Sequence, residues 1–143
     1  MSFLLDTCLL SELRRPRPNA GVLRWFENAA EDELFVSVST LAELMRGIEK
    51  ARRINIEHAA RLDTWLALIK LRFKSRTLDT DVTVWDSWAE ICGISDAAGQ
   101  PRPPVDTLLL ATAHIHELTI VTRNVGDFTP YPLVHNPWVE SGL

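Results

Sequence analysis

The chain has 143 residues, which is the size of one domain with a proper core. Hydrophobic residues make up 46% and charged residues 24%, as in ordinary globular proteins, and no apolar run approaches the roughly 20 residues of a membrane span. The N-terminus has no basic segment before its first acid, so a signal peptide is not expected. Cys8 and Cys92 are too few for a disulfide framework or a zinc ribbon, and a cytoplasmic location is expected.

The net charge is −4, from 15 basic and 19 acidic residues. Four of the acids, described below, account for this whole excess. The basic residues gather in three clusters, over residues 14–17, 46–53 and 70–76. A polyanionic partner is compatible with the acidic balance, because the local field of a cluster counts for more than the net charge. The alternative is that these clusters are solvated helix faces.

Strand-like and helix-like segments alternate along the chain, and this alternation predicts an α/β fold with a mostly parallel sheet of about four or five strands. The predicted strands are, in chain order, residues 3–5, 34–38, 76–78, 119–122 and 133–135. The predicted helices are a short helix after the first strand, then residues 19–30, 40–53 and 55–73, a helix capped by Asp79 or Asp81, and residues 105–117. No domain boundary is visible, so residues 1–143 are expected to form a single domain.

Helix starts are predicted from capping residues. Asn19 and Asn55 open two of the helices, and either Ser39 or Thr40 opens the helix between them. On the helix that starts at Asn55, apolar residues recur at the helical period and form one continuous face. The two helices over residues 46–73 form an inserted arm, which is a candidate dimer surface.

Four carboxylates lie where catalytic carboxylates occur in α/β proteins, each directly after a predicted strand, in the loop that follows one or near the start of a predicted helix: Asp6, Glu43, Asp106 and Asp127. The carboxyl ends of parallel strands share one edge of the sheet, where open α/β sheets build their sites. Four acids at that edge, without obvious basic partners, would repel one another, and a divalent cation is the simplest remedy. The sequence therefore favours a metal-dependent enzyme.

Each acid also has a purely structural explanation. Asp6 is a suitable N-cap, and Glu43 completes a capping box with Thr40. Asp106 suits the first turn of a helix, and Asp127 suits an Asx-turn. Taken together, these explanations require four independent caps or turns at the same edge of the sheet.

Other catalytic patterns are weak. His114 and His116 are two residues apart on a helix and face different ways, so they do not form a metal pair. The chain has no H-E-x-x-H, C-x-x-C, phosphate-loop or G-x-G-x-x-G motif. The two cysteines, one of them Cys8, are interpreted as small buried apolar residues. Trp85 and Trp88 are interpreted as core residues rather than as a base-stacking platform.

The combined motifs resemble the PIN-domain ribonucleases, specifically the VapC-like toxins of type II toxin–antitoxin pairs. The resemblance covers nearly the whole chain and rests on the order and spacing of five segments: FLLDT with LSEL over residues 3–13, STLAELMRGI over 39–48, PVDTL with ATA over 104–113, VTRN with DF over 121–128, and NPW over 136–138. It implies a three-layer α/β/α sandwich with a helical arm. One departure is Cys8, where family members often carry Asn.

The resemblance also implies the composition of the site. The acids Asp6, Glu43, Asp106 and Asp127 would hold one or two Mg²⁺ or Mn²⁺ ions, with Thr7, Thr122 and Asn124 as supporting polar residues. The implied reaction is in-line hydrolysis of single-stranded or looped RNA, with Glu43 as the candidate to orient the attacking water. Candidates for contacts to RNA phosphates are Arg46, Lys50 and Arg123.

The implied partners are an RNA substrate and a cognate antitoxin whose peptide enters the acidic site. A homodimer or a dimer of toxin–antitoxin pairs is expected, with operator DNA reached only through the antitoxin and no membrane partner. Two other functions stay open: a PIN-like regulatory subunit that chiefly dimerises and binds an antitoxin on operator DNA with little turnover, and a metal-dependent phosphatase. Phosphatases with an aspartyl nucleophile need a second Asp two residues after the first, and that position is Cys8.

Overall fold

A computed structural model describes residues 1–140 of the chain. Five parallel strands form one sheet in the order β3-β2-β1-β4-β5. They are β1 (Phe3–Leu5), β2 (Leu34–Ser37), β3 (Thr77–Leu78), β4 (Thr119–Val121) and β5 (Val134–His135). The predicted α/β fold with a parallel sheet is therefore confirmed, and each predicted strand is present.

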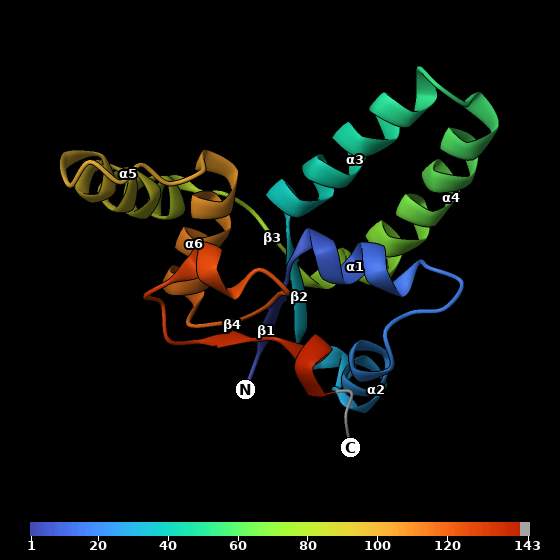
Figure 1. Cartoon of the computed structure of the whole chain (residues 1–143), viewed down its shortest axis with the longest axis horizontal. Coiled ribbons are helices and arrows are strands. Elements are labelled where there is room, and N and C mark those ends of the chain that lie inside the picture. The colour runs from blue at the N-terminus through green and yellow to red at the C-terminus, as the bar shows by residue number, and fades with distance from the viewer. Residues whose placement is uncertain (141–143) are drawn as a thin grey trace.

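Six helices and four short 3₁₀ turns surround the sheet within the described residues. The helices are α1 (Thr7–Leu13), α2 (Ala20–Asn28), α3 (Val38–Arg52), α4 (Ile56–Arg72), α5 (Val82–Ala97) and α6 (Pro104–His116). The 3₁₀ turns are η1 (Glu31–Glu33), η2 (Lys74–Arg76), η3 (Val125–Phe128) and η4 (Pro137–Glu140). Figure 1 shows α5 and α6 on one side of the sheet and α1 to α4 on the other, with α3 and α4 extending from the sheet as the helical arm. None of the described helices is long and apolar enough to cross a membrane.

Short strands support two separate cores because successive side chains point to opposite faces of a sheet. Leu5 and Val121 belong to the core shared with α1 to α4. Leu4 and Ile120, one residue earlier on the same strands, belong to the core shared with α6. All four side chains are fully buried. The three-layer sandwich expected from the resemblance is confirmed.

The chain changes direction across the sheet beside β1. It runs from β1 through β2 to β3 at one edge, and then places β4 and β5 on the other side of β1. Such a switch leaves a crevice outside the carboxyl ends of the two strands that flank it. The residues that follow these two strands are Asp6 and Thr122. The backbone N–H of Asp6 donates to the Val121 carbonyl at 3.1 Å, so the strands stay in register up to the crevice.

The start of α3 differs from the prediction. Ser37, rather than Ser39 or Thr40, is the N-cap, and its hydroxyl accepts the backbone N–H of Thr40 at 3.1 Å. The reason is that β2 enters α3 without an intervening loop. Glu43 is then the sixth helical residue, beyond the reach of a capping box, so the capping-box explanation of Glu43 is wrong.

The caps Asn19, Asn55 and Asp81 are confirmed, because each accepts a first-turn N–H of its helix. The prediction that both α5 tryptophans are core residues is wrong for Trp85, which is 44% exposed. Its neighbour Trp88 donates its Nε1–H to the Pro104 carbonyl at 3.0 Å. The physical reason is that α5 packs mainly on α6 rather than on the sheet, so only part of its apolar surface is covered.

A buried carboxylate joins three segments on the α1 side of the sheet. Glu12, only 7% exposed, accepts the backbone N–H of Asn19 at 3.1 Å and the Nε1–H of Trp138 at 3.4 Å. Arg15 lies 3.5 Å from the same carboxylate. Glu12 therefore ties α1 to the start of α2 and to η4.

Replacing Glu12 by Ala should destabilise the fold by about 1–3 kcal/mol, because it leaves two part-buried N–H donors without this acceptor. Urea unfolding followed by tryptophan fluorescence measures the change. Glu27→Ala on the exposed surface of α2 is the control, with an expected change within about 0.5 kcal/mol. Equal effects of the two substitutions would show that Glu12 does not join these segments.

Candidate active site

Asp6 directly follows β1 beside the end of β4, at the switch point of the sheet, and it is 8% exposed. Its Oδ1 accepts the backbone N–H of Thr7 at 2.7 Å, which makes Asp6 the N-cap of α1. Its Oδ2 accepts the Thr122 hydroxyl at 2.8 Å, and that hydroxyl oxygen accepts the backbone N–H of Asn124 at 3.0 Å. Asp6 is therefore a helix cap, as the structural explanation held, and also a rigidly held carboxylate at the switch point of the sheet.

Glu43 is brought to Asp6 by a contact between the first turn of α1 and the second turn of α3. The Thr7 hydroxyl in α1 donates to Oε1 of Glu43 in α3 at 3.1 Å. Burial raises the pKa of Glu43, the Thr7 hydroxyl opposes that shift, and the charges of Asp6 and Asp106 add to it. Glu43 is thus a half-buried acid in the field of two others.

Asp106 and Asp127 complete the cluster from α6 and η3. Asp106 is the third residue of α6 and is partly buried, whereas Asp127 lies in η3 and is exposed. Burial raises the pKa of Asp106, and the charges of Asp127 and Asp6 raise it further. These couplings, together with those at Glu43, join all four predicted acids in one electrostatic cluster.

The donor chemistry of this cluster fits a hard divalent cation. Mg²⁺ and Mn²⁺ prefer oxygen ligands, and the negative charges of neighbouring carboxylates add to the burial that raises the pKa of Glu43 and Asp106. Within residues 1–140, no three His, Cys, Asp or Glu side chains already stand together as a ligand set. The acids are nevertheless close enough to interact electrostatically, as the couplings at Glu43 and Asp106 indicate.

Cys8, expected to be an inert apolar residue, lies in the site. Its thiol is 3.7 Å from Oδ2 of Asp6 and 3.5 Å from the Thr122 hydroxyl, and its sulfur accepts the backbone N–H of Arg123 at 3.5 Å. Burial and the Asp6 charge raise the pKa of this thiol, so it stays protonated near neutral pH. The sequence signal for its role was its place two residues after Asp6 in the first turn of α1.

The three candidates for phosphate contacts lie in different surroundings. Arg46 lines a hollow of about 490 Å³ between α3, α6 and the segment after β3, and Glu43 lines the same hollow. Lys50 is exposed one turn further along α3. The Arg123 guanidinium lies over the Trp138 ring, 6.0 Å from its centroid. Of the three, Arg46 is the one placed beside the acids in a shared hollow.

Many of the basic residues have structural partners. Arg72 and Arg76 bind Glu31 at 2.8 and 2.9 Å, and the Arg72 hydrogen bond lowers the pKa of Glu31 to about 2. On the helical arm, Arg52 binds Asp63 at 2.8 Å. For these arginines, structural ion pairs account for the charge, and an RNA contact is not needed to explain them.

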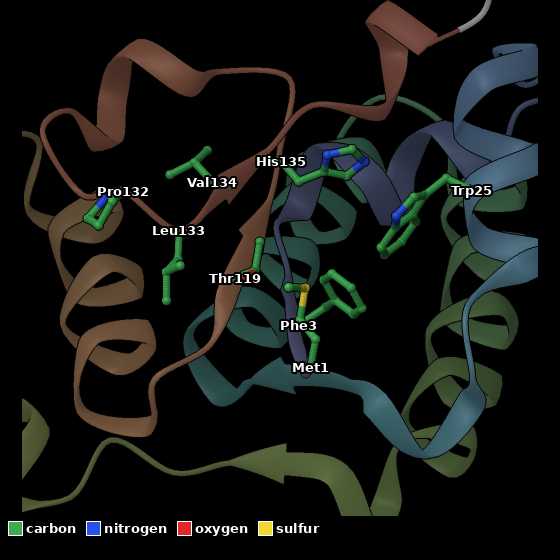
Figure 2. A pocket seen from close by; sticks show the side chains of 8 residues that line it. All are labelled: Met1, Phe3, Trp25, Thr119, Pro132, Leu133, Val134 and His135. Carbon is green, nitrogen blue, oxygen red and sulfur yellow. The ribbon is translucent and has the colours of Figure 1, made fainter.

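A second hollow, of about 430 Å³, is lined largely by aromatic and aliphatic side chains (Figure 2). Phe3 and Thr119, at the starts of β1 and β4, line it together with Trp25 and His135. Its lining includes none of the four acids. The candidate site is therefore at the carboxyl ends of the strands, where the acids lie.

The raised pKa values of Glu43 and Asp106 predict how the stability of the metal-free protein depends on pH. An acid with a raised folded-state pKa binds its proton more tightly when folded. Its contribution to stability is full below the unfolded pKa of about 4 and is lost as pH rises through the folded pKa. Glu43→Gln and Asp106→Asn remove the charge, so both should raise the urea midpoint of chelator-treated protein at pH 7 more than at pH 4.

Asp86→Asn, on the exposed surface of α5, is the control for this experiment. It should show no comparable difference between the two pH values. If the two site variants behaved like this control, the raised pKa values of Glu43 and Asp106 would be contradicted.

Comparison with known families identifies the chain. Residues 3–128 match the model of the PIN domain. The plasmid stability protein StbB of Pseudomonas syringae pv. tomato is 35% identical over 136 residues, which cover 94% of this chain and 97% of that protein. Toxin FitB of Neisseria gonorrhoeae is 32% identical over 139 residues, with 94% and 97% covered. VapC ribonuclease Y4jK of Sinorhizobium fredii is 28% identical over 140 residues, with 94% and 96% covered.

Solved structures agree. The crystal structure of FitAcB from Neisseria gonorrhoeae matches with a TM-score of 0.84 at 33% identity, over 95% of this chain and 98% of that chain. VapBC2 from Rickettsia felis, bound to a promoter DNA fragment, matches with a TM-score of 0.77 over 95% and 98%, and at 20% identity it supports the fold alone. The resemblance found in the sequence is therefore confirmed, and the chain belongs to the PIN-domain family.

Proposed function

We propose that the chain is a metal-dependent endoribonuclease and the toxin of a type II toxin–antitoxin pair. The observation that carries this proposal is the cluster of four electrostatically coupled acids at the switch point of the sheet. Relatives over nearly the whole chain are named toxin FitB and VapC ribonuclease, which supports the choice of reaction and of biological role.

The proposed cofactor is Mg²⁺, with Mn²⁺ as the alternative, held by Asp6, Glu43, Asp106 and Asp127. When bound, the cation supplies Lewis acidity for activating water and positive charge that balances the charge developing on the phosphodiester. The binding would also relieve the repulsion that raises the pKa of Glu43 and Asp106.

The residues have separate roles in this proposal. Asp6 is a fixed ligand because its two oxygens are held by different donors, with Thr122 and, through it, Asn124 supporting it. Glu43 orients the attacking water and takes its proton, since it is a half-buried carboxylate beside Asp6 and Asp106. The Thr7 hydroxyl holds Glu43 in place. Attack in line would leave a 5′-phosphate and a 3′-hydroxyl.

Single-stranded or looped RNA is the proposed substrate, because unpaired strands enter a recessed acidic crevice more readily than a duplex. Arg46 would contact a phosphate near the scissile bond, since it shares a hollow with Glu43. Lys50 and Arg123 would extend this path along α3 and past the end of β4.

The proposed protein partner is a cognate antitoxin that neutralises the toxin in the cytoplasm by placing a peptide, with its own positive charge, among the four acids. Structures titled as FitAB bound to a DNA fragment and as toxin–antitoxin complexes are among the neighbours. We propose the same assembly here: a homodimer, or a dimer of toxin–antitoxin pairs, that reaches operator DNA only through the antitoxin. The helical arm of α3 and α4 is the proposed dimer surface.

The purified chain, freed of antitoxin, should cleave single-stranded RNA with Mg²⁺ or Mn²⁺ and lose this activity in EDTA. Asp6→Asn and Asp106→Asn should each lower the rate by more than about 100-fold, because even residues that only support metal ligands contribute 10–100-fold. Gel-based cleavage of a labelled RNA measures the rate, with circular dichroism to verify the fold and Asp86→Asn as the control.

Two outcomes would contradict this proposal. Cleavage that survives Asp6→Asn or Asp106→Asn in a folded protein would exclude the four-acid mechanism. Antitoxin and Mn²⁺ binding without any turnover of RNA would instead favour the regulatory subunit.

Arg46→Ala should raise KM with little change in kcat, because it removes a phosphate contact outside the reacting groups. RNA affinity is measured in an inactive Asp106→Asn background. There, Arg46→Ala should reduce the magnitude of the slope of log RNA affinity against log salt concentration by about 0.7–1, which is the contribution of one phosphate contact. Lys74→Ala, before the N-terminal end of β3, is the matched loss of a positive charge and should leave the slope unchanged. Equal slopes for the two variants would remove Arg46 from the RNA path.

A further inference from the structure

Arg102 was not singled out by its sequence context, yet its guanidinium joins two separate segments next to the acids. Its Nη1 donates to the carbonyl of Asp127 at 3.3 Å, and its Nη2 donates to the carbonyl of Thr129. Its Nε donates to the hydroxyl of Ser95, in the last turn of α5, at 3.2 Å. One side chain therefore attaches the backbone at the end of η3 to α5.

The position of Arg102 in the chain also links it to Asp106. It lies in the short connection between α5 and α6, four residues before Asp106. This connection turns at Gly99, whose φ of +72° lies in the left-handed region that glycine adopts without strain. A single short segment thus carries Asp106 on α6 and, through Arg102, holds the segment that carries Asp127.

Phe128, at the end of η3, is buried in the core beside α6, whereas Asp127 just before it is exposed. Asp127 lies on a four-residue 3₁₀ turn, in which its backbone N–H donates to Asn124 at 3.0 Å. Such turns have poorer hydrogen-bond geometry than an α-helix, and like charges favour moving Asp127 away from Asp106. The guanidinium binds backbone carbonyls here, so it orders the segment without taking up the Asp127 carboxylate.

We propose that Arg102 is a positioning residue that clamps the Asp127 segment to α5 and so keeps Asp127 beside Asp106 for a shared cation. This inference rests on the proposed function, because it treats Asp127 as a metal ligand. Arg102 acts through the backbone carbonyls of Asp127 and Thr129, on either side of Phe128, and does not itself touch metal or RNA.

Mn²⁺ affinity, measured by isothermal titration calorimetry on the full chain, tests the clamp without relying on activity. Arg102→Ala should weaken Mn²⁺ binding by about 10–100-fold, the range for residues that orient metal ligands. Asp127→Ala should weaken it at least as much, and the double variant should be no weaker than Asp127→Ala alone, because the clamp acts only through Asp127. Arg102→Lys keeps the charge but not the planar fork, so its affinity should be intermediate.

Arg52→Ala is the matched control. It also removes a guanidinium that makes several hydrogen bonds, but these go to Glu49 and Asp63 on the helical arm. It should lower the melting temperature and leave Mn²⁺ affinity unchanged. A merely structural Arg102 would behave in the same way as Arg52.

The outcomes separate the clamp from the function on which it rests. Wild-type affinity in folded Arg102→Ala or Arg102→Lys, or losses that add fully in the double variant, would overturn the clamp alone. A wild-type chain that binds no Mn²⁺ would overturn the proposed metal site, and the clamp with it. If Arg102→Ala does not fold, the additivity of the losses in Mn²⁺ affinity is tested with the double variant that combines Arg102→Lys and Asp127→Ala.

Discussion

The hydrogen bond from Thr122 to Asp6 joins the ends of β1 and β4 at the switch point of the sheet, and the rest of the site is arranged around it. The same carboxylate caps α1, which places Thr7 where its hydroxyl reaches Glu43 on α3. Two strands and two helices are therefore oriented by one buried acid. Cys8 reinforces the junction by contacting both Asp6 and Thr122, so its thiol is part of the site.

The fold holds negatively charged side chains close together in the site, although they repel one another. Burial and neighbouring charge raise the pKa of both Glu43 and Asp106, which means that the metal-free fold holds them at some cost in stability. Several arginines elsewhere are paired with acids, as Arg52 is with Asp63 and Arg72 with Glu31. Arg102, which lies near the site, binds backbone carbonyls instead. This arrangement orders the acidic segments and leaves the negative potential available to a cation.

Local signals predicted much of the fold. Asn19 and Asn55 cap their helices because a side-chain acceptor needs only the next few residues of its own chain. The same reasoning failed at Glu43: Thr40 and Glu43 have capping-box spacing, but β2 continues directly into α3 and Ser37 is the cap. Trp85 was misjudged for a different reason, since its exposure depends on α5 packing on α6 rather than on the sheet.

The sequence by itself determined the alternation of strands and helices, the family, and the placement of four acids next to strand ends or helix starts. Those features depend on local propensity and on spacing along the chain. Only the tertiary structure decided which groups meet the acids. Thr122 reaches Asp6 across 116 positions, and Arg102 reaches the Asp127 backbone across 25. Such contacts depend on strand order and helix packing, which no local pattern encodes.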